Sequence, residues 1–107
     1  MKKINKPLKL GFVGGGINSA IGQTHFSASQ LDGKWKVVSG IFSENKKINK
    51  KTANMWNISR DRVYDNLKNF IKNEKNKLDA VVVIVPIPVH FKIIYELKKN
   101  DLEVVLA

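Results

Sequence analysis

A glycine-rich turn is the first feature of the sequence whose residue types could perform chemistry. Three glycines at positions 14–16 follow a short apolar run, Leu8–Val13, and precede a segment of helical periodicity. In this strand–turn–helix context Gly14 allows a sharp turn, and Gly16 lets the backbone approach a pyrophosphate that lies on the free amides of the helix. The third glycine of the dinucleotide-binding pattern would fall at Ser19, which is small enough for close packing. The turn therefore predicts a dinucleotide site.

A polar stretch after the second apolar run could recognise the ribose of such a dinucleotide. Dinucleotide sites usually place an acid at the end of the second strand, where it binds the ribose hydroxyls of NAD. Here Ser43 occupies that point, with Glu44 next and Lys46 and Lys47 just beyond. Glu44 could bind a 2′-hydroxyl, whereas a hydroxyl followed by lysines could accommodate the 2′-phosphate of NADP. The choice between NAD and NADP therefore stays open.

The two histidines are the remaining side chains that could move a proton near neutral pH. His90 follows two prolines at the carboxyl end of a predicted strand at 78–85, beside the expected position of a nicotinamide. It would sit by the ribose, so it is a candidate contact and not a persuasive acid or base. His25 falls inside the first helical segment, where we expect it to pack or cap. We predict no catalytic residue in the chain.

The elements that must position these residues alternate along the chain. Short apolar runs predict strands, and apolar residues three and four apart predict helices. The pattern gives strands at 8–13, 35–42, 62–64, 78–85 and 102–106, separated by helices at 17–30, 46–56, 67–75 and 90–99. Such alternation predicts a single α/β domain with a doubly wound parallel sheet, a Rossmann arrangement of about five strands with helices on both faces. Ligands of such sheets bind beyond the carboxyl ends of the strands.

Polarity also predicts where helices begin and which faces they bury. Ser43 or Asn45 is expected to cap the second helix, and Asp65 or Asn66 the third. The expected inward residues are Ile17, Ala20, Ile21, Thr24 and Ala28 in the first helix, and Phe91, Ile94, Tyr95 and Leu97 in the last.

Composition excludes several kinds of function. The 107 residues contain no Cys, which excludes disulfides, thiolate nucleophiles and cysteine-ligated metals. Apolar runs are far shorter than the ~20 residues that span a bilayer, so we expect no membrane segment. We also expect a cytoplasmic protein that binds no metal. The net charge of +10 attracts polyanions. However, only Arg60 and Arg62 are Arg and the lysines are scattered, so nucleic-acid binding is not favoured.

The glycine turn belongs to an ordered set of motifs that extends from Leu8 to Ala107. The set comprises Gly11–Gly16, Ser19, Ile21-Gly22, His25, Leu31–Gly33, Val38–Ser43, Arg62–Tyr64, Leu78–Val81, Pro86 and His90-Phe91. Together these motifs resemble the amino-terminal domain of the Gfo/Idh/MocA oxidoreductases, the family of glucose–fructose oxidoreductase and inositol dehydrogenase.

The resemblance implies a Rossmann domain followed, in the family, by a mixed α/β domain that binds substrate and mediates oligomerisation. It implies NAD or NADP as cofactor, and oxidation or reduction of a sugar, a polyol or a related hydroxyl or carbonyl compound. It also implies a homo-oligomer formed through the second domain. The implied cofactor contacts are Gly14, Gly16, Ile17 and Asn18 at the phosphates, Ser43 at the adenosine ribose, and Val85, Pro86 and His90 around the nicotinamide half.

Two departures from the family pattern limit this reading. The family's Glu-Lys-Pro segment, whose Lys contributes to catalysis, would begin directly after Ala107, so we expect a truncated cofactor-binding domain without turnover. Val85 stands where Thr or Ser is common, which removes a possible hydroxyl contact.

Two other functions stay open. One is a stand-alone nucleotide-sensing or nucleic-acid-binding module, driven by the charge of +10. The other is an S-adenosylmethionine-binding domain, since such domains also use a glycine-rich first loop. Against the latter, the strand at 78–85 ends in Pro-x-Pro-x-His with no acidic cluster.

Overall fold

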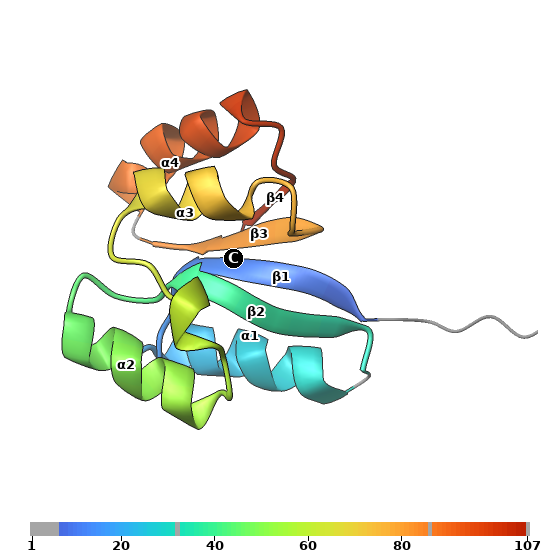
Figure 1. The fold of residues 1–107 in the computed structure, drawn as a ribbon, viewed down its shortest axis with the longest axis vertical. Coiled ribbons are helices and arrows are strands. Elements are labelled where there is room, and N and C mark those ends of the chain that lie inside the picture. Colours follow the sequence, from blue (N-terminus) through green and yellow to red (C-terminus); the bar gives the residue numbers. More distant parts are fainter. Residues whose placement is uncertain (1–6, 32, 86, 107) are drawn as a thin grey trace, which may run out of the picture.

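The computed structural model describes residues 7–31, 33–85 and 87–106 and forms one three-layered α/β unit (Figure 1). A parallel sheet of strand order β2-β1-β3-β4 has α1 and α2 on one face and α3 and α4 on the other. The elements in chain order are β1 (Leu8–Gly14), α1 (Ala20–Leu31), β2 (Trp35–Ile41), α2 (Lys46–Met55), the 3₁₀ helix η1 (Arg60–Arg62), α3 (Leu67–Glu74), β3 (Ala80–Ile84), α4 (Ile87–Lys99) and β4 (Val104–Leu106). The predicted fold class is confirmed.

The predicted strand at 62–64 is not formed as a strand. The chain makes η1 there, and Val63 contributes a single parallel bridge to Gly40. The segment is held by its side chains instead, as described below for Arg62 and Tyr64. The sheet therefore has four strands among the described residues, close to the expected five.

The sheet is buried on both faces because its central strands carry apolar residues on both sides. Phe12 and Val82 pack towards α1 and α2, whereas Val13, Val81 and Val83 pack towards α3 and α4. Trp56, which follows α2, stacks on Phe26 of α1 at 4.2 Å between ring centroids and meets Phe12 and Phe42 edge to face. This aromatic cluster joins both helices to the sheet.

The predicted caps at Asn45 and Asn66 are confirmed, because each side chain accepts amide hydrogen bonds at the start of its helix. The predicted inward faces are partly wrong. In α1 the buried residues are Gly22 and Ser29, with Phe26 packed on the core, and the predicted Ala20, Ile21, Thr24 and Ala28 are exposed. In α4 Leu97 is buried as predicted, but Phe91 and Tyr95 are 81% and 64% exposed, and Ile93 packs on the core instead.

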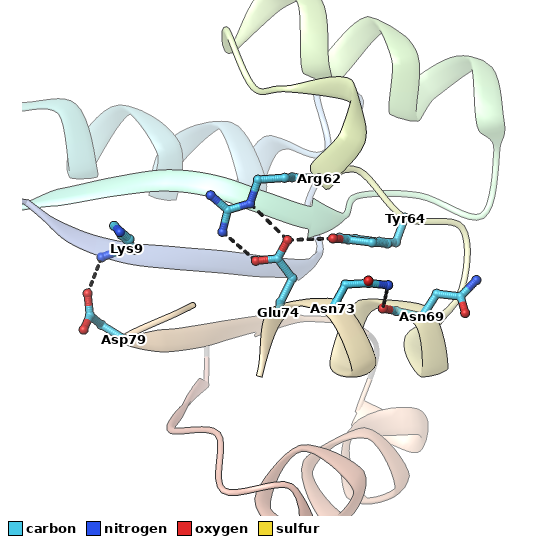
Figure 2. A network of polar contacts seen from close by, with 7 residues as sticks. All are labelled: Lys9, Arg62, Tyr64, Asn69, Asn73, Glu74 and Asp79. Carbon is cyan, nitrogen blue, oxygen red and sulfur yellow. Dashed lines mark hydrogen bonds and ion pairs between the residues drawn. The ribbon is translucent and has the colours of Figure 1, made fainter. Parts of the chain in front are cut away.

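A buried ion pair attaches η1 to α3 (Figure 2). Arg62 donates to both carboxylate oxygens of Glu74, at 3.0 Å from Nε and 2.6 Å from Nη2, and the Tyr64 hydroxyl donates to the same carboxylate at 2.7 Å. The Glu74 side chain is 0% exposed and that of Arg62 is 27% exposed. Burial acts to raise the pKa of Glu74, but the Arg62 and Tyr64 hydrogen bonds outweigh it and the pKa is lowered. Burial, and then the bond to Glu74, raise the pKa of Tyr64. The network fixes the chain that leads to Asp65.

Candidate dinucleotide site

A groove opens at the carboxyl edge of the sheet, where the sequence predicts the ligand site. It has a volume of about 570 Å³. We call it the edge groove; its lining residues are Val13, Gly14, Ile41, Ser43, Glu44, Asp65, Asn66, Leu67, Val85, Val89 and Ile93. Of the residues predicted from the sequence, Gly14, Ser43 and Val85 thus come together, whereas Pro86 lies outside the described residues.

A larger hollow, of about 730 Å³, lies between α3 and α4 and is lined in part by Leu67, Ile71 and Lys75. It runs along two helices, whereas ligands of parallel sheets bind at the strand ends. The edge groove is therefore the better candidate for the site.

The turn after β1 has the conformation that its glycines predict. Gly14 and Gly15 have φ of +83° and +74°, which glycine adopts readily. A Cβ at Gly14 would lie 2.1 Å from the Ile84 carbonyl oxygen, so no other residue fits there. At Gly16 a Cβ would point into the protein, 3.1 Å from both Phe42 Cβ and Thr52 Oγ1. A side chain at position 16 would therefore require Phe42 or Thr52 to move by a few tenths of an ångström.

The close contact between α1 and the turn is made by Gly22 and not by Ser19, to which the sequence analysis gave that role. A Cβ on Gly22 would lie 1.9 Å from the Gly15 carbonyl oxygen, so the helix rests directly on the turn. Ser19 instead caps α1: its hydroxyl accepts from the Gly22 amide at 3.0 Å, and its carbonyl accepts from the Gln23 amide at 2.9 Å. The pattern is offset because the loop between turn and helix is longer than in G-x-G-x-x-G.

The amino end of α1 offers donors that fit a pyrophosphate. The amides of Asn18, Ala20 and Ile21 have no hydrogen-bond partner among the described residues. Unpaired first-turn amides and the helix dipole together favour an anion. The Ile17 amide, by contrast, already donates to Thr52 Oγ1 at 3.2 Å, so it supports the loop from inside. The chain thus fits a dinucleotide at the turn, with Asn18 better placed than Ile17 to donate.

Two buried polar residues of α2, which sequence reasoning missed, hold the loops on either side of the site. Thr52 Oγ1 accepts from the Ile17 amide and donates to the Ile48 carbonyl at 2.8 Å. Asn49 Oδ1 accepts from the amides of Phe42 and Ser43, both at 3.0 Å, and its Nδ2 donates to the Ser43 carbonyl at 2.8 Å. Polar residues at inward helical positions, between apolar Ile48 and Ala53, were the signal that could have identified them.

The lining of the edge groove next to β2 is polar and acidic. Ser43 lies at the end of β2, where its hydroxyl accepts from the Asn45 amide at 3.0 Å and keeps its own proton to donate. Glu44 and Asp65 both line the same groove, and Asp65 directly follows the segment that Arg62 and Tyr64 anchor. Sequence reasoning considered Asp65 only as a cap; its place in the groove follows from the sheet order, which no local pattern reveals.

The histidines occupy different places. His90 lies in the first turn of α4, after β3, and is not among the residues that line the edge groove. Its Nε2 is buried and has no hydrogen-bond partner among the described residues. His25 lies on α1 and lines a separate hollow with Trp35 and Val105.

Among the described residues no group of three or more His, Asp or Glu could hold a metal ion. No helix in this part of the chain is long and apolar enough to cross a membrane.

Comparison with known proteins identifies the family of the chain. A family model described as an oxidoreductase family with an NAD-binding Rossmann fold, GFO_IDH_MocA, matches residues 8–106. No curated protein shows a significant sequence match.

Similar solved structures cover nearly all of the chain. An inositol dehydrogenase homologue from Azotobacter vinelandii, complexed with NAD⁺, is 29% identical with a TM-score of 0.87, over 98% of this chain and 28% of that one. An oxidoreductase from Sinorhizobium meliloti is also 29% identical, with a TM-score of 0.83, over 94% of this chain and 29% of that one. An oxidoreductase from Pseudomonas syringae, 24% identical with a TM-score of 0.88 over 96% of this chain and 29% of that one, shares the fold. This chain thus spans less than a third of the length of these structures. Because the family model matches residues 8–106, the chain belongs to the Gfo/Idh/MocA oxidoreductases as an NAD-binding Rossmann domain.

Proposed function

We propose that this chain is the dinucleotide-binding part of an NAD(P)-dependent oxidoreductase that acts on a sugar, a polyol or a related hydroxyl or carbonyl compound. The observation that carries the proposal is the first turn of α1, where unpaired amides follow a left-handed glycine turn at the sheet's carboxyl edge. The neighbour from Azotobacter vinelandii, crystallised with NADH and myo-inositol, supports the substrate class.

Each side chain at the edge has a role in this proposal. The amide of Asn18, with Gly14 and Gly16 shaping the turn and Ile17 supporting it, would hold the pyrophosphate. Ser43 would donate to the adenosine ribose, and Val85 would border the nicotinamide half. His90 would lie near the nicotinamide ribose; among the described residues its buried Nε2 has no hydrogen-bond partner. When bound, the cofactor supplies hydride transfer, and the protein orients it.

Substrate binding and proton transfer would then rest on parts of the longer relatives that this chain does not span. We therefore expect it to bind dinucleotide without turnover, with any homo-oligomer formed through such parts. Because NAD and NADP are kept inside cells, we place the function in the cytoplasm. Nucleic acid is not part of the proposed function.

Calorimetric titration of the chain with NADH and with NADPH tests the proposal. We expect saturable binding that survives a rise from about 0.1 M to about 0.5 M salt, because most contacts are short-range hydrogen bonds. Asn18→Asp places a carboxylate where the phosphates would bind and should weaken binding about tenfold or more. Asn76→Asp makes the same change on an exposed residue that lies before β3, at the opposite edge, and should leave binding unchanged. A folded chain that binds neither dinucleotide would refute the proposal.

A further inference from the structure

Ser43, Glu44 and Asp65 line the edge groove, which under the proposed function would hold the adenosine ribose next to β2. Resting on the proposed function, we propose that this site selects NAD: Glu44 and Asp65 line the groove where a 2′-phosphate would lie, and the chain itself occupies the backbone donors that such a phosphate would need. The two dinucleotides differ only in this group, so the argument concerns donors and charge around the adenosine ribose.

The backbone donors between β2 and α2 are already used. Asn49 Oδ1 accepts from the amides of Phe42 and Ser43. Asn45 Oδ1 accepts from the amides of Lys47 and Ile48 at 2.8 and 3.3 Å.

The Asn45 amide in turn donates to Ser43 Oγ. Only the amides of Glu44 and Lys46 in this stretch lack a partner among the described residues. A helix start capped in this way has few free amides that could bind a phosphate.

The charge lining the groove also opposes a phosphate. Glu44 and Asp65 are exposed, and neither carboxylate is hydrogen-bonded or ion-paired within the described part of the chain. A phosphate monoester brings a charge near −2 at neutral pH, which both carboxylates would repel. A free 2′-hydroxyl, in contrast, can donate to either of them, and this is how acids at this edge recognise NAD.

The lysines near the site do not reverse this balance. No Lys or Arg is among the described residues that line the edge groove. Lys46 and Lys47 are exposed in the first turn of α2, where their long side chains reach into solvent. The net charge of +10 attracts both dinucleotides and so raises both affinities, most strongly at low salt.

Paired calorimetric titrations with NADH and NADPH at about 0.15 M salt test the inference, and they report binding without any catalytic readout. We expect NADH to bind at least about tenfold more tightly. Glu44→Gln and Asp65→Asn should each reduce this ratio about threefold or more, chiefly by improving NADPH binding. Glu103→Gln removes an exposed carboxylate before β4, at the far edge, and should leave the ratio unchanged.

The outcomes separate the inference from the proposed function. Equal or tighter binding of NADPH by the unaltered chain would overturn NAD selection while leaving dinucleotide binding in place. A preference for NADH that neither Glu44→Gln nor Asp65→Asn reduces would also overturn it, since the carboxylates would then not be its cause. Absence of binding to both dinucleotides counts against the proposed function itself.

Discussion

Replacing Arg62 by Met tests the buried ion pair that anchors the chain before the edge groove. The substitution removes the two Arg62 nitrogens that donate to Glu74 and keeps an unbranched side chain of similar length. The Glu74 carboxylate stays buried, and among the described residues the Tyr64 hydroxyl still donates to it. Removing one partner of a buried pair costs about 3–5 kcal/mol. Because Arg62 is 27% exposed, water can reach the vacated space, so we expect the lower end, about 3 kcal/mol, at neutral pH.

The pH dependence of this loss distinguishes an uncompensated charge from lost packing. In the unaltered chain the lowered pKa of Glu74 gives stability that is present above its ordinary value of 4.5 and is lost as the pH falls through the folded-state value. Without Arg62, burial dominates and raises the folded-state pKa above the ordinary value. The deficit of Arg62→Met relative to the unaltered chain should therefore shrink as the pH falls towards 4.5.

Urea unfolding followed by tryptophan fluorescence, at about pH 7 and about pH 5, measures both effects. Arg60→Met is the matched control. Arg60 is exposed and its side chain donates to Asn54 Oδ1 at 3.4 Å, so its replacement should change stability by at most about 0.5 kcal/mol. Arg62→Met combined with Glu74→Leu should regain at least half of the loss, since no unpaired charge remains. A loss below about 1 kcal/mol, or one that does not change with pH, would refute the reasoning and make the pair equivalent to an exposed one.

Three further predictions concern the turn, its support and the activity of the chain. Gly22→Ala should lower the free energy of unfolding by at least about 3 kcal/mol, because the added Cβ would overlap the Gly15 carbonyl. Gly33→Ala, at φ +68° with no atom within 4 Å of the added Cβ, should lower it by about 1–2 kcal/mol. Thermal unfolding measures both changes. Thr52→Val leaves the part-buried Ile17 amide without this acceptor, which should cost about 1–2 kcal/mol of stability and weaken NADH binding about tenfold. Thr52→Ser should restore both, and equal affinities for the two variants would contradict the role of the hydroxyl. The purified chain should show no cofactor-dependent oxidation of sugars or polyols by absorbance; any such turnover that depends on the chain would contradict this.

The strands and the caps could be predicted because their signals are local. The run at 80–85 is apolar at every position, and Asn45 and Asn66 precede their helices directly. The inward faces of α1 and α4 could not be predicted, since both helices have apolar residues on two sides. Ile21 and Phe91 fit a helical stripe as well as Phe26 and Ile93 do, and only the tertiary contacts decide between them.

The residues around the edge groove likewise divide into those with a local sequence signal and those without one. Gly14 and Ser43 could be predicted because each follows a strand directly, and the strand ends of a parallel sheet meet at one edge. Asn49 and Thr52 could not, since a polar residue within a helix usually faces solvent. The strand predicted at 62–64 failed because Arg62 and Tyr64 pair with Glu74, which is far enough along the chain that no short window includes all three.

The position of Asn49 and Thr52 on the same helix has a consequence for how a ligand enters. They are three residues apart on α2, a rise of about 4.5 Å; Asn49 holds the loop that follows β2, and Thr52 holds the loop that follows β1. The separation of the two loops is thus set by a single helical turn, before any ligand arrives. Little loop entropy remains to be lost on binding, so the association step needs no prior folding of the site.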